Sequence, residues 1–108
     1  MIRETLNSKN NFLISFNNFN GSGWDDDVQK VIENYLNPIK LSKRIITQSW
    51  YYSEKEFDLE KDNVKFLLHL DDDGPIYLVL QSDLTEENKQ KLRDWATIIA
   101  QEVEKLKQ

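Results

Sequence analysis

The only histidine of the chain, His69, is the first residue that could carry acid–base chemistry. A histidine serves as the base for a nucleophile when a hydroxyl or a thiol lies within hydrogen-bond reach. The chain has no cysteine, and no Gly-x-Ser-x-Gly turn presents a serine. Strand alternation instead places His69 on the face of Lys65 and Asp71, opposite the apolar residues of that segment. We therefore predict no catalytic residue, and we interpret His69 as a solvated or interface histidine.

Two aspartate triplets, at residues 25–27 and 71–73, could offer carboxylates to Mg²⁺ or Ca²⁺. A calcium loop needs acids at alternate positions, whereas Asp71, Asp72 and Asp73 are contiguous. Consecutive residues of a helix point about 100° apart, so the triplet at 25–27 cannot face one ion. A turn and a helix start both favour aspartate. We predict no metal site and no cofactor.

The net charge of −5 is concentrated in residues 54–73, which contain eight acids and three bases, while the other 88 residues carry eleven of each. Clustered like charge steers an oppositely charged partner. We predict that this segment binds a basic protein, and its expected contact residues are Glu54, Glu56, Asp58, Asp71, Asp72 and Asp73. The prediction fails if Lys40, Lys43 and Arg44 neutralise these acids within the fold.

The densest aromatic cluster, Trp50, Tyr51 and Tyr52, directly precedes the acidic segment. In a strand, Tyr51 faces away from Trp50 and Tyr52. One face must join the core, and the other either exposes a large ring beside the acids, as protein interfaces do, or is covered by a helix. We predict that all three residues take part in partner binding.

Four segments have the apolar pattern of strands, namely residues 11–19, 42–59, 64–70 and 76–80. The second is longer than an ordinary strand, so we expect a bulge or a break near Ser53. Asp62 and Asn63 suit a tight turn between the second and third segments, because both residue types tolerate the backbone angles of a reversal.

Two further segments have the helical period. The first begins after Gly23 and stops before Pro38, which forces the preceding residue out of the helical region. The second is capped by Thr85 and carries an apolar seam formed by Leu92, Ala96, Ile99, Val103 and Leu106. The element order β-α-β-β-β-α predicts an α+β fold, a two-layer sandwich of a mostly antiparallel four-stranded sheet and two helices, with residues 1–108 in one domain.

The composition excludes several classes of protein. A mean hydropathy of −0.67 and 31% charged residues argue against a membrane span, and the N-terminal residues lack a signal-peptide pattern. An isoelectric point near 4.8 argues against nucleic acid as a ligand, because phosphate binding depends on Lys and Arg. The absence of cysteine fits a reducing compartment. We expect a cytoplasmic protein.

In length, acidity, lack of cysteine and lack of a signal sequence, the chain resembles the small cytoplasmic immunity proteins of bacterial toxin–immunity systems. The resemblance implies a non-enzymatic module that neutralises a cytoplasm-acting, nuclease-type toxin by covering its basic active site. On this interpretation the acids at 54–58 and 71–73 replace the phosphate backbone, and Trp50 with Tyr51 or Tyr52 supplies the buried anchor.

An alternative is a small acidic secretion-type chaperone or adaptor that binds a client protein. Here the seam of the last helix would be the interface, and the protein would be a monomer or a weak homodimer. Such a seam is also the pattern of a helix that packs on its own sheet.

Overall fold

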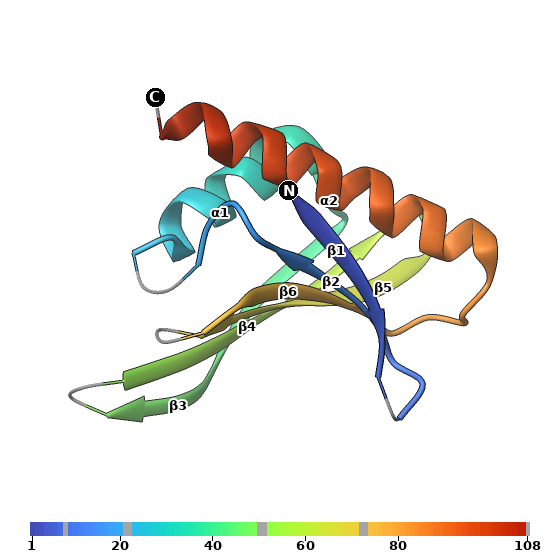
Figure 1. The fold of residues 1–108 in the computed structure, drawn as a ribbon, viewed down its shortest axis with the longest axis horizontal. Coiled ribbons are helices and arrows are strands. Elements are labelled where there is room, and N and C mark those ends of the chain that lie inside the picture. The colour runs from blue at the N-terminus through green and yellow to red at the C-terminus, as the bar shows by residue number, and fades with distance from the viewer. Residues whose placement is uncertain (8, 21–22, 50–51, 72–73, 108) are drawn as a thin grey trace.

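The computed structural model describes residues 1–7, 9–20, 23–49, 52–71 and 74–107, and it joins them in one antiparallel sheet with helices on one side (Figure 1). The elements are β1 (Ile2–Leu6), β2 (Phe12–Phe16), α1 (Asp25–Val31), η1 (Ile32–Leu36), β3 (Lys40–Ser49), β4 (Tyr52–Lys61), β5 (Val64–Asp71), β6 (Ile76–Leu80) and α2 (Glu86–Leu106). The strand order across the sheet is β1-β2-β6-β5-β4-β3.

The predicted four-stranded sheet is wrong, because the sheet has six strands in the described residues, although the α+β class holds. Strand β1 was not predicted: charged Arg3 and Glu4 separate its two apolar ends, and the strand forms by pairing with the outer edge of β2. The single long segment at 42–59 is in fact a hairpin of β3 and β4, paired from Lys40↔Glu60 to Ser49↔Tyr52. The break expected near Ser53 is therefore a reversal of the chain just before it.

Strand β2 lies inside the sheet and closes it by a long-range pairing with β6, from Phe16↔Ile76 to Leu13↔Val79. The meander β3-β4-β5-β6 supplies the remaining neighbours through local hairpins. The predicted turn at Asp62 and Asn63 is confirmed: both residues have positive φ, 51° and 64°, as the tight turn between β4 and β5 requires.

The helical predictions are confirmed at both of their boundaries. Segment η1 continues α1 and ends at Asn37, whose left-handed φ of 49° precedes Pro38. Helix α2 begins after Thr85, whose hydroxyl accepts a hydrogen bond from the Asn88 amide at 3.1 Å. The cap satisfies one amide at the start of the helix that would otherwise lack a partner.

The core lies between the sheet and the helices. Alternate residues of β2, β5 and β6 point into it, and helix α2 places its apolar seam on the same space. Its largest fully buried side chains include Ile14, Phe57, Phe66, Leu68, Ile76, Leu78, Leu92 and Ile99. Phe66 stacks on Trp95 of α2 at 5.1 Å between ring centroids.

The hairpin of β3 and β4 extends beyond the helices at one side of the molecule (Figure 1). Every residue of the run 42–46 in β3 is exposed, including Ile45 at 56%. A register shift between Ile45 and Thr47 interrupts the pairing of the two strands. This part of the sheet has little core beneath it, so its cohesion depends on backbone pairing and on polar side-chain contacts.

Candidate functional site

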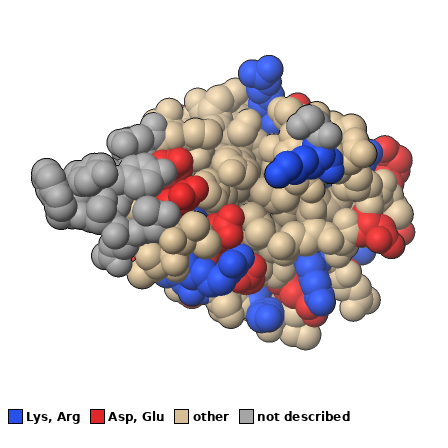
Figure 2. Space-filling view, turned by 90° about the horizontal axis from the view of Figure 1, so that it is seen from below, with Lys and Arg blue, Asp and Glu red and all other residues tan. Residues whose placement is uncertain are grey.

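The predicted acidic residues that the structure describes lie on the open face of the sheet, away from the helices. Phe57 and Leu59 of β4 are buried in the core, so Glu54, Glu56 and Asp58 point to the opposite side. Figure 2 looks onto this open face, where carboxylates gather next to the undescribed tip and the centre is largely uncharged. The prediction that these acids share one face is consistent with the strand parity.

The pairing of β4 with β5 brings four polar residues into a compact cluster, which we call the His69 cluster: Glu54, Glu56, His69 and Asp71. Glu54 pairs with Asp71, and Glu56 pairs with His69, so the four residues form the corners of a cross-strand square. The Nε2 atom of His69 lies 3.0 Å from a Glu54 oxygen, and its Nδ1 atom lies 3.2 Å from Glu56 Oε2. Both ring nitrogens thus face carboxylates.

The expectation of a solvated His69 is wrong, because the residue is only 6% exposed although it belongs to the open face. Tyr77 of β6 lies beside it, with ring centroids 4.8 Å apart and an angle of 21° between the ring planes. Burial raises the pKa of the Tyr77 phenol above its ordinary value, and the charges of Glu56 and Glu54 raise it further. Tyr77 therefore stays a neutral lid over the imidazole.

Arg44 of β3 neutralises part of the acidic segment. Its guanidinium donates to both oxygens of Asp58, at 2.6 and 3.0 Å, and to Glu56 Oε1 at 3.1 Å. The hydrogen bond and the charge of Asp58 raise the pKa of Arg44 further above its ordinary value. The expected uncompensated ridge is thus interrupted at Glu56 and Asp58.

The lysines of the hairpin act on the other face of the sheet. Lys55 Nζ lies 2.7 Å from Asp25 Oδ2, and Lys43 Nζ lies 3.7 Å from the same oxygen. Asp25 is the first residue of α1, so these contacts connect the hairpin to the helix layer. The hydrogen bond from Lys55 holds the pKa of Asp25 below its ordinary value. Lys40 has no ion pair within the described part of the chain.

Five of the nine predicted contact residues give no structural test. Trp50, Tyr51, Asp72 and Asp73 lie outside the described residues, and of Tyr52 only the backbone pairing is described. The aspartate triplet at 25–27 does lie in the first turn of a helix, as expected.

The apolar seam of α2 is used inside the molecule. Leu92, Ala96, Ile99 and Val103 are all buried in the core, and of the seam residues only Leu106, at the end of the helix, is exposed. The helix therefore covers its own sheet. No helix of the described residues is long and apolar enough to cross a membrane.

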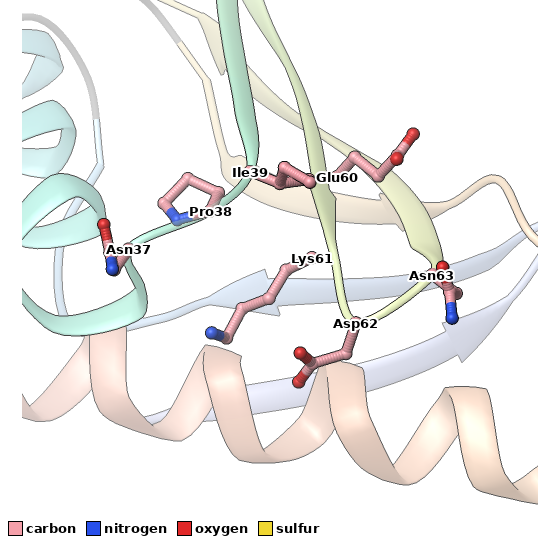
Figure 3. A pocket seen from close by; sticks show the side chains of 7 residues that line it. All are labelled: Asn37, Pro38, Ile39, Glu60, Lys61, Asp62 and Asn63. Atoms are coloured by element: carbon pink, nitrogen blue, oxygen red, sulfur yellow. The ribbon is translucent and has the colours of Figure 1, made fainter.

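A cavity of about 410 Å³ lies at the opposite end of β4 from the His69 cluster. Figure 3 shows its lining residues, Asn37, Pro38, Ile39, Glu60, Lys61, Asp62 and Asn63. They come from the loop that leads into β3 and from the turn between β4 and β5, and the Glu60 carboxylate points away from Lys61 and Asp62. The lining mixes both charges and contains no histidine, so it offers no acid–base pair of the kind that an enzyme requires.

Sequence reasoning missed the meeting of Glu54 and Glu56 with His69, although a signal for it existed. A two-residue turn at Asp62 and Asn63 pairs Lys61 with Val64 and, counting outward, fixes every later pair of the hairpin. That count brings residue 56 opposite residue 69, and residue 54 opposite residue 71. The prediction of one long, irregular second strand hid this consequence.

The chain matches no protein-family model, no curated protein and no solved structure.

Proposed function

We propose that this chain is a non-enzymatic protein-binding module for a basic partner, and that it acts in the cytoplasm as an immunity protein against a nuclease-type toxin. One observation carries the proposal: carboxylates of two neighbouring strands meet on the one face of the sheet that no helix covers. A surface of this kind can occupy the basic groove with which a nuclease grips phosphates.

The internal ion pairs narrow the surface that a partner would use. Arg44 already binds Glu56 and Asp58, so these two acids offer a partner less uncompensated charge. Glu54 and Asp71 lie farther toward the tip of the sheet, beyond the reach of the Arg44 contacts. We therefore place the centre of the proposed interface at Glu54 and Asp71.

A binding role also accounts for the state of the single histidine. The nitrogens of His69 contact Glu54 and Glu56 rather than a serine or threonine hydroxyl. The ring is buried under Tyr77, where a substrate has little access to it. These contacts favour a structural or binding function for His69 over a catalytic one.

The chaperone alternative receives less support, because its proposed interface is the seam of α2. That seam packs on the sheet of the same chain, and a client would have to displace it at the cost of the core. No observation on the described residues favours this second function.

The test is the binding of the purified chain to the nuclease domain encoded next to it, followed by surface plasmon resonance at low and high salt. We expect Glu54→Lys and Asp71→Lys to slow association about tenfold or more at low salt, because long-range attraction sets the rate of encounter. Both variants should also flatten the dependence of the rate on salt.

Glu33→Lys is the matched control, since it makes the same change of charge at an exposed position of η1 in the helix layer. We expect it to alter the association rate less than about twofold. Equal effects of all three variants would show that only net charge matters and would overturn the proposed interface, and an absence of any binding to the nuclease would overturn the immunity function.

A further inference from the structure

We propose that Glu54, His69 and Asp71 bind a single divalent transition-metal ion of the Zn²⁺ class. One ligand atom from each residue lies within 4.8 Å of the other two. Imidazole and carboxylate together suit Zn²⁺, whereas Ca²⁺ and Mg²⁺ prefer shells made of oxygen alone. The proposal concerns the isolated chain and does not depend on the proposed partner.

The distances suit a metal bound by a small adjustment of side chains. Ligands at about 2.0–2.2 Å from a tetrahedral Zn²⁺ stand roughly 3.4 Å from each other. The His69 Nε2 atom is already 3.0 Å from a Glu54 oxygen, so an ion can replace the proton between them with little movement. Asp71 pairs directly with Glu54 and reaches the same point by rotation of its side chain.

Glu56 holds the imidazole in the orientation that a metal needs. A metal-binding histidine usually donates its second N–H to a carboxylate, which fixes the ring and the tautomer. Here His69 Nδ1 lies 3.2 Å from Glu56 Oε2, and the other Glu56 oxygen accepts from Arg44 at 3.1 Å. This leaves Nε2 directed toward Glu54, with the ring plane further fixed by Tyr77.

Electrostatics supplies an independent reason for a cation at this place. Glu54 and Asp71 are direct cross-strand partners, and like charges in that position destabilise a sheet. A divalent ion between them converts this repulsion into two attractive contacts. Three protein ligands also leave a coordination position for water or for a donor from another molecule.

Zinc titration of the full-length chain tests the site. The protein is prepared without a histidine tag, stripped with EDTA and titrated with ZnCl₂ by calorimetry and NMR. Because His69 is the only histidine, one imidazole signal reports the site directly. We expect one Zn²⁺ per chain with a dissociation constant below about 100 µM, and a shift of the His69 signal that saturates with it.

Variants identify the ligands. Glu54→Gln and Asp71→Asn each remove one carboxylate from the partly exposed surface of the cluster, and we expect each to weaken zinc binding at least about tenfold. Glu60→Gln is the matched control, because Glu60 lies on the same strand and face as Glu54 but outside the cluster. It should keep the affinity within about twofold.

A thermal unfolding curve of each metal-free variant confirms that it is folded before titration. A wild-type dissociation constant above about 100 µM, or wild-type affinity in Asp71→Asn, would overturn the three-ligand site. Equal weakening by Glu60→Gln would do the same, because it would indicate diffuse attraction to surface charge. None of these measurements involves the nuclease, so the site and the proposed function stand or fall separately.

Discussion

The centre of the sheet and its β3–β4 hairpin are held by different forces. In the centre, β5 and β6 bury alternate apolar residues against α2, and Phe66 and Leu78 are fully buried. In the hairpin, residues 42–46 of β3 are exposed, and Arg44 bonds across the strands to Asp58. The comparison teaches that burial fixes one half of the sheet, while backbone pairing and ion pairs hold the other.

Removal of a core ring should separate the two regions most clearly. We expect Phe66→Ala to lower the free energy of unfolding by about 3–5 kcal/mol, because it removes the stack on Trp95 and leaves a cavity. The same truncation in the hairpin, Ile45→Ala, should cost less than about 0.5 kcal/mol, because that side chain is largely exposed. Urea unfolding followed by circular dichroism measures both, and similar losses would contradict the comparison.

A smaller effect should follow from cutting the connection between the hairpin and the helix layer. Asp25→Asn removes the charge that Lys55 and Lys43 bind, and we expect a loss of about 1 kcal/mol in the free energy of unfolding at pH 7. Asp26→Asn is the control, since Asp26 is an exposed neighbour in the same first turn. The two variants should differ in stability by most of that amount.

The same pair of variants predicts a dependence on pH. The pKa of Asp25 is lowered in the folded state, chiefly by the hydrogen bond from Lys55. The stabilisation is therefore fully present above the ordinary aspartate value of 3.8 and is lost as the pH falls through the lower folded-state value. The gap between wild type and Asp25→Asn should narrow over that range, and a constant gap down to acidic pH would rule out the ion pairs as its cause.

The smallest effect concerns the exposed ion pair of the hairpin. Arg44→Gln removes the contacts with Glu56 and Asp58, and we expect amide hydrogen exchange in β3 and β4 to accelerate about two- to fivefold. Exchange in β5 and β6 should stay unchanged. Lys40→Gln, an exposed change on the same strand, is the control. Acceleration throughout the sheet would mean that the hairpin and the centre open together.

Local patterns predicted much of the fold. Helix α2 with its Thr85 cap, the turn at Asp62 and Asn63, and the alternating faces of β5 all follow from short-range chemistry. Strand β1 and the separation of β3 from β4 were missed, because neither has a strong apolar alternation or a recognised turn at its boundary. Pairing with neighbours makes these segments strands.

The candidate site divides in the same way. Its carboxylates and His69 were assigned to one side of their strands by parity alone, and the structure agrees for the described residues. The contacts of Arg44 could not be foreseen, since they depend on the unpredicted pairing of β3 with β4.

The sequence by itself determined which side chains share a face of each strand and where the helices begin, because these features depend on neighbours a few positions away. Only the tertiary structure decided that β2 closes the sheet against β6, that the carboxylate face stays free of helices, and that His69 is buried beneath Tyr77. These features join segments far apart in the chain. Their free energy comes from packing and charge contacts that exist only once the whole sheet has formed.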